Sequence, residues 1–224
     1  MKNLLESLTI EEKIRLLTGK GVWHTDTANV KLKSVLMMDG PQGLRLAPDS
    51  LESPAHGMNE EDLKKVEPTI MPSEFNLANT WDKDLVYLNG QTIAEDCIDF
   101  NVDILLAPGI SIKRTPLCGR NFEYFSEDPY LAGEMGKAYV LGVQSKGVGT
   151  SLKHFCLNNR EHDRFSLNSV CEERVMREIY FPAFKKTLEA KPYSIMSSYN
   201  RVNGTYMAEN KELLDDLLKK RVGV

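Results

Sequence analysis

Two charged residues stand side by side in the stretch SLKHFCLNNREHDRF, residues 151 to 165, where Lys153 and His154 follow a short apolar-leaning run. Neighbouring residues on a β-strand point to opposite faces. Unless the backbone turns there, at least one of the two side chains is therefore expected to lie against the protein interior. Because a buried charge needs a partner, the pair predicts a nearby carboxylate or a bound ligand. The stretch is a candidate for either bond breaking or substrate binding.

Other polar groups also follow apolar runs. Asp39 comes directly after SVLMM, in the segment DGPQGLR, where it either accepts two ligand hydroxyls or only initiates a turn. Arg120 and Glu123 stand among aromatic residues in CGRNFEYFSEDP. They either belong to a functional site or only form a salt bridge that holds a packed loop. Tyr199 ends a later apolar run, where a phenol can pack in the core or orient an acidic group.

Metal-dependent and acyl-transfer chemistry have no support in the sequence. His154 and His162 could be metal ligands, but the chain has four histidines in all and lacks both an HExxH motif and facial-triad spacing. The sequence contains no GxSxG motif, so a Ser-His-Asp triad for acyl transfer is not supported either. We therefore expect no metal and no other cofactor.

Helices and strands must position these groups, and the chain alternates between the two. Thr9 and Glu12 predict a capping box ahead of the helix IEEKIRLLTG. Ser169 and Glu172 predict another, which opens a helix that Pro182 should kink. That helix feeds the apolar run YSIMSSYN, and two earlier helical stripes feed VDILLAPG and VGTSLKHF. The pattern is helix then strand, repeated.

This repeat predicts parallel β/α units. Right-handed crossovers bring the carboxyl ends of all strands to one face, and Asp39, Lys153 and Tyr199 come at such ends. In a (β/α)8 barrel that face holds the active site. A doubly wound open sheet repeats the same units and remains an alternative, although no GxGxxG or Walker sequence favours a nucleotide fold.

The bulk composition narrows the class of protein. With 224 residues, of which 42% are hydrophobic, the chain is long enough for one large globular domain. A net charge of −4 and the lack of a long basic block argue against nucleic acid. No apolar run is long enough to predict membrane insertion or a secretion signal. The four cysteines form no CxxC pair, which predicts reduced thiols and a cytoplasmic location.

Six fragments of the sequence carry a resemblance to a known family. In chain order they are LTIEEKIRLLTG, DGPQGLR, GRNFEYFSEDPYLAG, GVGTSLKHFCLNNREHDR, REIYFPAF and SIMSSYNRVNGTYMAENKELL. Together they closely resemble the N-terminal domain of glycoside hydrolase family 3, of the β-glucosidase type. Any one fragment is weak evidence, whereas six in the family's order, covering nearly the whole chain, are specific.

The resemblance implies a TIM-like (β/α)8 barrel and retaining hydrolysis of terminal nonreducing β-D-glucosyl residues. It also implies six residues that line the pocket for the nonreducing sugar, which are Asp39, Arg120, Lys153, His154, Arg164 and Tyr199. Carboxylates and cations can bind neighbouring pyranose hydroxyls through charge-assisted hydrogen bonds, and a tyrosine hydroxyl can hold the geometry of a nucleophile. The loop after Lys-His-Phe lacks the Pro-Gly-His-Gly of the N-acetylglucosaminidase branch, so His162 is not expected to be a catalytic acid.

The catalytic pair itself is not expected within this chain. Retaining glycosidases use two carboxyl groups about 5 to 5.5 Å apart. In the family the nucleophilic Asp follows a Trp-Gly-Phe whose place is taken here by the last three residues, so we expect the nucleophile beyond Val224 and the acid/base in a later domain. Residues 1–224 then form an incomplete barrel domain without its last β/α units and without the second α/β domain, inactive alone.

Three expectations about partners follow. The substrate is a β-glucoside or an oligosaccharide, with the sugar and the linkage left open. An inert carbohydrate-binding or regulatory protein, or one half of a split barrel, remains the alternative function. The open edges of an incomplete barrel predict self-association, because unpaired strands and exposed apolar surface recruit other chains.

Overall fold

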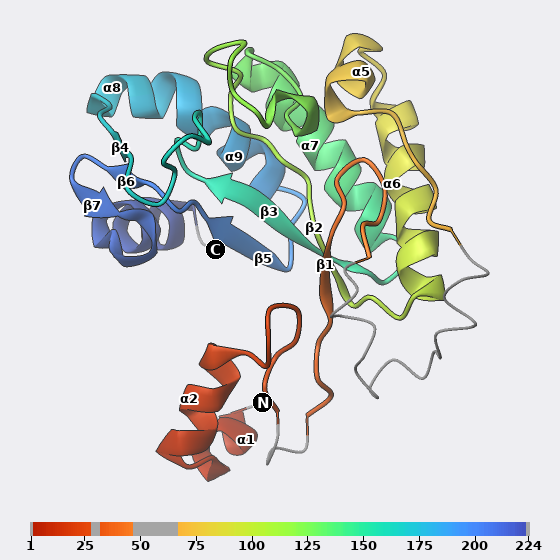
Figure 1. Ribbon diagram of the computed structural model, residues 1–224, viewed down its shortest axis with the longest axis vertical. Coiled ribbons are helices and arrows are strands. Elements are labelled where there is room, and N and C mark those ends of the chain that lie inside the picture. The colour runs from red at the N-terminus through yellow and green to blue at the C-terminus, as the bar shows by residue number, and fades with distance from the viewer. Residues whose placement is uncertain (1, 28–31, 47–66, 223–224) are drawn as a thin grey trace.

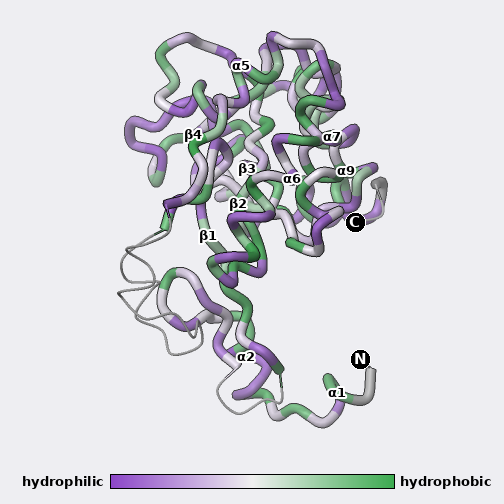
Figure 2. The backbone as a smooth tube through the Cα atoms, turned by 90° about the vertical axis from the view of Figure 1, so that its right-hand side faces the viewer, coloured by the Kyte–Doolittle hydropathy of each residue, from purple (hydrophilic) through white to green (hydrophobic). Residues whose placement is uncertain are grey.

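The computed structural model describes residues 2–27, 32–46 and 67–222. Its N-terminal part holds two short helices, α1 (Lys2–Ser7) and α2 (Ile10–Thr18), which project away from the rest of the molecule in Figures 1 and 2. The predicted capping box is confirmed: the Thr9 hydroxyl accepts from the Glu12 amide at 3.2 Å, and Glu12 Oε2 accepts from the Thr9 amide at 2.8 Å. This local pattern therefore fixes where α2 begins.

A four-stranded parallel sheet forms the centre of the protein (Figure 1). Its strands, in spatial order, are β1 (Met37–Asp39), β2 (Ile104–Leu106), β3 (Gly149–Phe155) and β5 (Ser194–Ser197). The register places Met38 beside Leu105 and Leu152 beside Ile195, and all four of these side chains belong to the hydrophobic core or pack against it. The predicted parallel β/α units are confirmed.

Three helices lie next to one another along one side of this sheet (Figure 1). They are α6 (Lys83–Asp99), α7 (Pro129–Gln144) and α9 (Phe181–Leu188). The central strands follow one another in space in the order of the chain, without the reversal at which a doubly wound sheet changes direction. Sequential strands behind a single helical layer favour the barrel over the open sheet.

Helices α6 and α7 approach each other closely through two glycines. A methyl group added at Gly142 would lie 2.2 Å from the carbonyl oxygen of Tyr87, and one at Gly90 would lie 2.7 Å from that of Tyr139. Neither position has room for a side chain. Gly90 thus interrupts the apolar stripe of α6 because the backbone of α7 occupies the space where a side chain would stand.

Shorter elements surround the sheet. The helical ones are α5 (Glu74–Asn79), η2 (Asn121–Glu123), α8 (Glu173–Val175), η3 (Met176–Tyr180), η4 (Met207–Glu209) and η5 (Glu212–Val222). A second small sheet contains β4 (Asn168–Ser169), β6 (Arg201–Val202) and β7 (Thr205–Tyr206) in that order. The predicted capping box at Ser169 is wrong. The Ser169 hydroxyl donates to the Leu157 carbonyl at 3.1 Å instead, because the residue lies in β4 rather than before a helix.

The predicted disturbance around Pro182 takes the form of a wide turn. The backbone winds as a π-helix over η3 immediately before α9, which carries Pro182 in its first turn. Proline has no N–H to donate, so a helix that continues through it must rearrange the preceding turn. The chain therefore passes directly from η3 into α9, and the helix type changes from π to α at that point.

The hydrophobic core lies between the sheet and the helical layer. All seven residues of β3 are buried, and the Phe155 ring meets the Phe184 ring of α9 edge to face, with centroids 5.0 Å apart. Strand β3 is thus packed tightly against the helical layer. This packing fixes the position of the polar residues at its carboxyl end. Within the described ranges, no helix combines the length and apolar character needed to cross a membrane.

Candidate functional site

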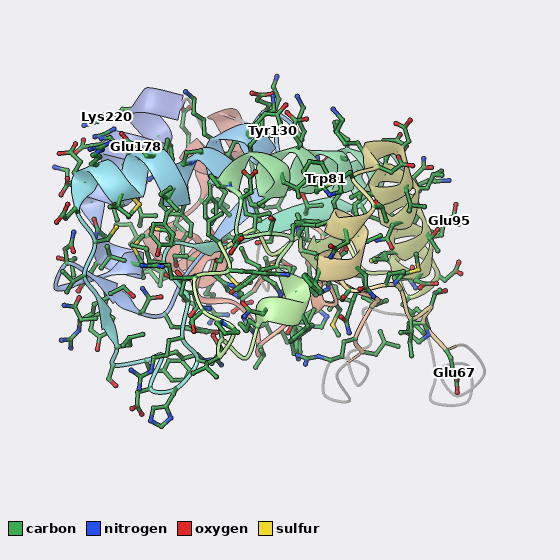
Figure 3. The ribbon with its side chains drawn as sticks, turned by 90° about the horizontal axis from the view of Figure 1, so that it is seen from above. Glu67, Trp81, Glu95, Tyr130, Glu178 and Lys220 are labelled. Atoms are coloured by element: carbon green, nitrogen blue, oxygen red, sulfur yellow. The ribbon has the colours of Figure 1, made fainter. Side chains whose placement is uncertain are left out.

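A cavity of about 650 Å³ opens at the carboxyl ends of the first strands. Asp39 ends β1, Lys153 lies near the end of β3, and Arg120 and Glu123 come from the segment after β2; all four line the cavity. Glu67 also lines the cavity, and in Figure 3 it lies on the opposite side of the molecule from Tyr130 and Glu178. The predicted convergence of the polar groups on one face is confirmed for these residues.

The turn after β1 brings a second charge back to Asp39. The Arg45 amide donates to the Asp39 carbonyl at 2.8 Å, and Arg45 Nη2 lies 2.7 Å from Asp39 Oδ2. Within this turn a Cβ at Gly40 would meet the carbonyl oxygen of Gly43 at 2.1 Å, so only glycine fits there. Asp39 therefore both initiates the turn and presents its carboxylate, and the two alternatives for this residue are compatible.

Lys153 is the buried charge that the sequence predicts. Its Nζ lies 3.3 Å from Asp39 Oδ1 and 3.4 Å from Glu123 Oε2, and its side chain is 2% exposed. Three elements of the chain, β1, β3 and η2, meet at this ammonium group. The expected carboxylate partner exists, and there are two of them.

The ion pairs continue beyond Glu123. Arg120 Nε lies 3.3 Å from Glu123 Oε1 and 3.2 Å from Glu161 Oε2, and Arg164 Nη1 lies 2.7 Å from the same Glu161 oxygen. Burial opposes the charge of Arg120, but the neighbouring carboxylates outweigh it and raise the pKa of Arg120 above its ordinary value.

Seven side chains thus form one alternating series of charges, which we call the charge ladder. Its members, in order of contact, are Arg45, Asp39, Lys153, Glu123, Arg120, Glu161 and Arg164. Four cations and three carboxylates stand next to opposite charges throughout. An ordered row of this kind suits a ligand rich in neighbouring hydroxyl groups, since each charged group strengthens the hydrogen bonds it makes.

His154 is held by protein groups at both ring nitrogens. The Arg120 guanidinium contacts Nε2, and the Tyr124 hydroxyl lies 2.9 Å from Nδ1. A guanidinium only donates, so Nε2 accepts and the proton belongs on Nδ1. Burial, and then the positive charges of Arg120, Lys153 and Arg164, lower the pKa of His154 well below its usual value. The ring is therefore neutral, and it reaches a ligand only if Arg120 moves aside.

Arg164 and Tyr199 meet at the far end of the ladder. The Arg164 guanidinium lies 5.0 Å from the ring centroids of Phe165 and of Tyr199, and those two rings are 4.8 Å apart. The stack fixes the planar guanidinium over aromatic faces, an arrangement that lysine could not replace. His162 does not join it: its side chain is 75% exposed and pairs with Asp163 at 3.0 Å.

The six predicted sugar-pocket residues fall into one connected network. Sequence reasoning did not assign a role to Arg45, Tyr124 or Glu161. For Glu123 it offered a salt bridge within the loop, and that ion pair with Arg120 is present. The only signal for Arg45 was its place in DGPQGLR, six residues after Asp39. In the part of the chain that the structure describes, no group of three or more His, Cys, Asp or Glu side chains is arranged to hold a metal ion.

Comparison with known proteins decides the family. The family described as "Glycosyl hydrolase family 3 N terminal domain" matches residues 50–224. The chain belongs to glycosyl hydrolase family 3. The described strands and helices are accordingly part of the TIM-like barrel of that family, as the resemblance implied.

Relatives in this family are much longer proteins. The chain is 44% identical over 222 residues to thermostable β-glucosidase B of Acetivibrio thermocellus, and 46% identical over 222 residues to an exo-α-(1→6)-L-arabinopyranosidase of Bifidobacterium longum. In both cases the match covers 98% of this chain and 28% of the relative. The chain thus spans less than a third of the length of these family 3 proteins.

Solved structures of the family agree in fold. A GH3 β-glucosidase of Bifidobacterium adolescentis superposes with a TM-score of 0.87 at 42% identity, covering 98% of this chain and 30% of that one. β-Glucosidase 3B of Thermotoga neapolitana, solved in complex with glucose, gives 0.89 at 39% identity, covering 99% and 32%. Both likenesses extend over nearly every residue of the chain.

Proposed function

We propose that this chain supplies the sugar pocket of a β-glucosidase-type glycoside hydrolase, which hydrolyses terminal nonreducing β-D-glucosyl residues with retention of configuration. The charge ladder is the observation that carries the proposal, because five of its members line the cavity, namely Arg45, Asp39, Lys153, Glu123 and Arg120. Comparisons with other proteins also support it. The chain belongs to the family, one relative is called a β-glucosidase, and one similar structure was solved with glucose.

The chemistry of the ladder fits a pyranose. Asp39 accepts hydrogen bonds, and the ammonium of Lys153 beside it donates them, so two hydroxyls on adjacent carbons can bridge the pair. Arg45 is exposed at the mouth and can move to a hydroxyl without leaving a buried charge unpaired. Tyr199 and Arg164 remain our proposed contacts at the other end.

We further propose that these 224 residues alone bind sugar without hydrolysing it. Retaining chemistry needs one carboxylate free to attack and one carboxyl group that carries a proton. Asp39, Glu123 and Glu161 are each held between two cations, which suits binding and orientation rather than proton transfer. The nucleophile and the acid/base are expected outside the chain.

Calorimetric titration with glucose tests the binding. We expect a measurable Kd in the 224-residue chain, which Lys153→Met weakens by at least about tenfold, or about 1.4 kcal/mol. Lys146→Ala is the matched control, because Lys146 pairs with Glu95 at 2.7 Å on the helical layer, away from the cavity. Arg45→Ala provides an exposed second variant that should fold normally. No heat of binding in the folded wild-type chain would refute the proposal.

Hydrolysis is tested separately with aryl glycosides. The relatives carry two different names, a β-glucosidase and an arabinopyranosidase, so both an aryl β-glucoside and an aryl α-L-arabinopyranoside belong in the assay. Turnover that disappears in Asp39→Asn or Glu161→Gln would overturn the proposed inactivity. A coding stretch for Ser-Asp-Trp directly downstream in the DNA would distinguish a partial hydrolase from an inert binding or regulatory protein and from a split barrel.

We also propose that the chain self-associates and that it is located in the cytoplasm. β1 and β5 are the outer strands of the central sheet in the described residues, and α2 exposes the apolar side chains of Ile10, Ile14 and Leu17. Both observations favour a second copy of the chain as partner. Sedimentation velocity that shows a monomer at every concentration would contradict this.

The four free cysteines support a reducing compartment, which fractionation of cells would test.

A further inference from the structure

Glu123 stands at the centre of the charge ladder. Its carboxylate joins Lys153, which comes from β3, to Arg120, which precedes η2. The Glu123 side chain is 5% exposed and that of Lys153 is 2% exposed. Two cations from different elements therefore converge on one buried carboxylate.

Glu123 lines the cavity beside the two cations that it pairs with, and its carboxylate is almost closed off from solvent. Its Oε1 atom is shut off from solvent and makes no hydrogen bond, although Arg120 Nε lies 3.3 Å away as an ion pair. Its Oε2 faces the Lys153 ammonium. The two cations that Glu123 pairs with, and Asp39 beside Lys153, line the same cavity.

Without the charge of Glu123 the two cations would no longer stay where they are. Lys153 would retain Asp39 as its ion-pair partner, and Arg120 would retain Glu161 together with its contact to His154, so each side chain would turn toward its remaining partners. A closer Lys153–Asp39 pair leaves fewer donors and acceptors for a ligand. The effect on binding thus passes through the cations.

We propose that Glu123 is the positioning residue of the pocket: its charge sets the places of Lys153 and Arg120, and through them the affinity for the sugar. This inference rests on the function proposed above. It predicts that the charge of Glu123, and not merely its volume, determines sugar affinity.

Glu123→Gln tests the proposal, because it keeps the shape and removes the charge. Glu134→Gln is the matched control: Glu134 also bridges two lysines, Lys83 at 3.2 Å and Lys186 at 3.1 Å, but on the helical layer. We expect Glu123→Gln to raise the Kd for glucose about tenfold or more while Glu134→Gln leaves it unchanged. Glu123→Asp, which keeps the charge, should recover part of the affinity.

A crystal structure of Glu123→Gln gives a readout that needs no sugar. The inference expects Lys153 and Arg120 to leave their wild-type positions, with Lys153 closing on Asp39. Unchanged positions overturn it, whether or not the wild-type chain binds glucose, and so does an unchanged Kd. Displaced cations in a protein that binds no glucose would support the positioning role and refute the proposed function, so the two failures are distinguishable.

Discussion

Glu74 is a buried carboxyl group whose ionisation works against folding. It lies in the first turn of α5, is 0% exposed, and neither of its oxygens has a hydrogen-bond partner in another of the described residues. Burial raises its pKa to about 8; a backbone hydrogen bond of its own opposes the rise, Glu123 adds to it, and Lys153 and Lys113 oppose it more weakly. The neutral acid is thus the form that the fold accommodates.

The consequence for stability has a definite sign. A carboxyl group with a folded-state pKa above its unfolded value binds its proton more tightly in the native state, so its favourable contribution is fully present below pH 4.5. That contribution is lost as the pH rises from 4.5 to about 8, and it changes no further above that. At about 1.4 kcal/mol for each pH unit, the loss amounts to on the order of 5 kcal/mol.

Urea unfolding of the wild type and of Glu74→Gln, across pH 4 to 9, measures this contribution. The neutral amide imitates the protonated acid, so the two proteins should have similar free energies of unfolding near pH 4. The variant should become progressively more stable than the wild type up to about pH 8. Exposed Glu95→Gln is the control and should show no such trend. A stability difference independent of pH, or a variant less stable than the wild type at pH 9, would refute the reasoning.

Three further changes test the packing and capping of the helical layer by urea unfolding. Phe184→Ala removes the ring that meets Phe155 in the core and should cost about 3–5 kcal/mol. Asp128→Ala removes the N-cap of α7, whose carboxylate accepts from the Tyr130 amide at 2.7 Å, and should cost about 1 kcal/mol. Gly142→Ala should destabilise by about 1–3 kcal/mol, because its methyl group would press on the neighbouring helix.

Each of these three has an outcome that contradicts its reason. A loss below about 1 kcal/mol in Phe184→Ala would mean that the ring is not part of a packed core. No change in Asp128→Ala would show that solvent caps α7 as well as the carboxylate does. A gain in stability in Gly142→Ala, as helix propensity alone predicts, would show that α6 and α7 can separate at no cost.

Much of the fold was open to sequence reasoning because it depends on local patterns. The capping box at Thr9 joins residues three apart, and the apolar runs that become strands are contiguous. The charged residues Asp39 and Lys153, near the carboxyl ends of β1 and β3, could be placed on one face, since parallel strands end together. The box predicted at Ser169 failed for the converse reason: the same local pattern was overridden by pairing with Val202, thirty-three residues later.

The sequence by itself determined which polar residues stand at the carboxyl ends of the strands, and that they need partners. Only the tertiary structure decided which residues are their ion-pair and hydrogen-bond partners. Lys153 meets Asp39 across 114 positions of the chain, and both nitrogens of His154 are taken by residues from the loop after β2. The reason is physical: an ion pair depends on distance in space, which the packing of strands and helices sets, and no spacing along the chain encodes it.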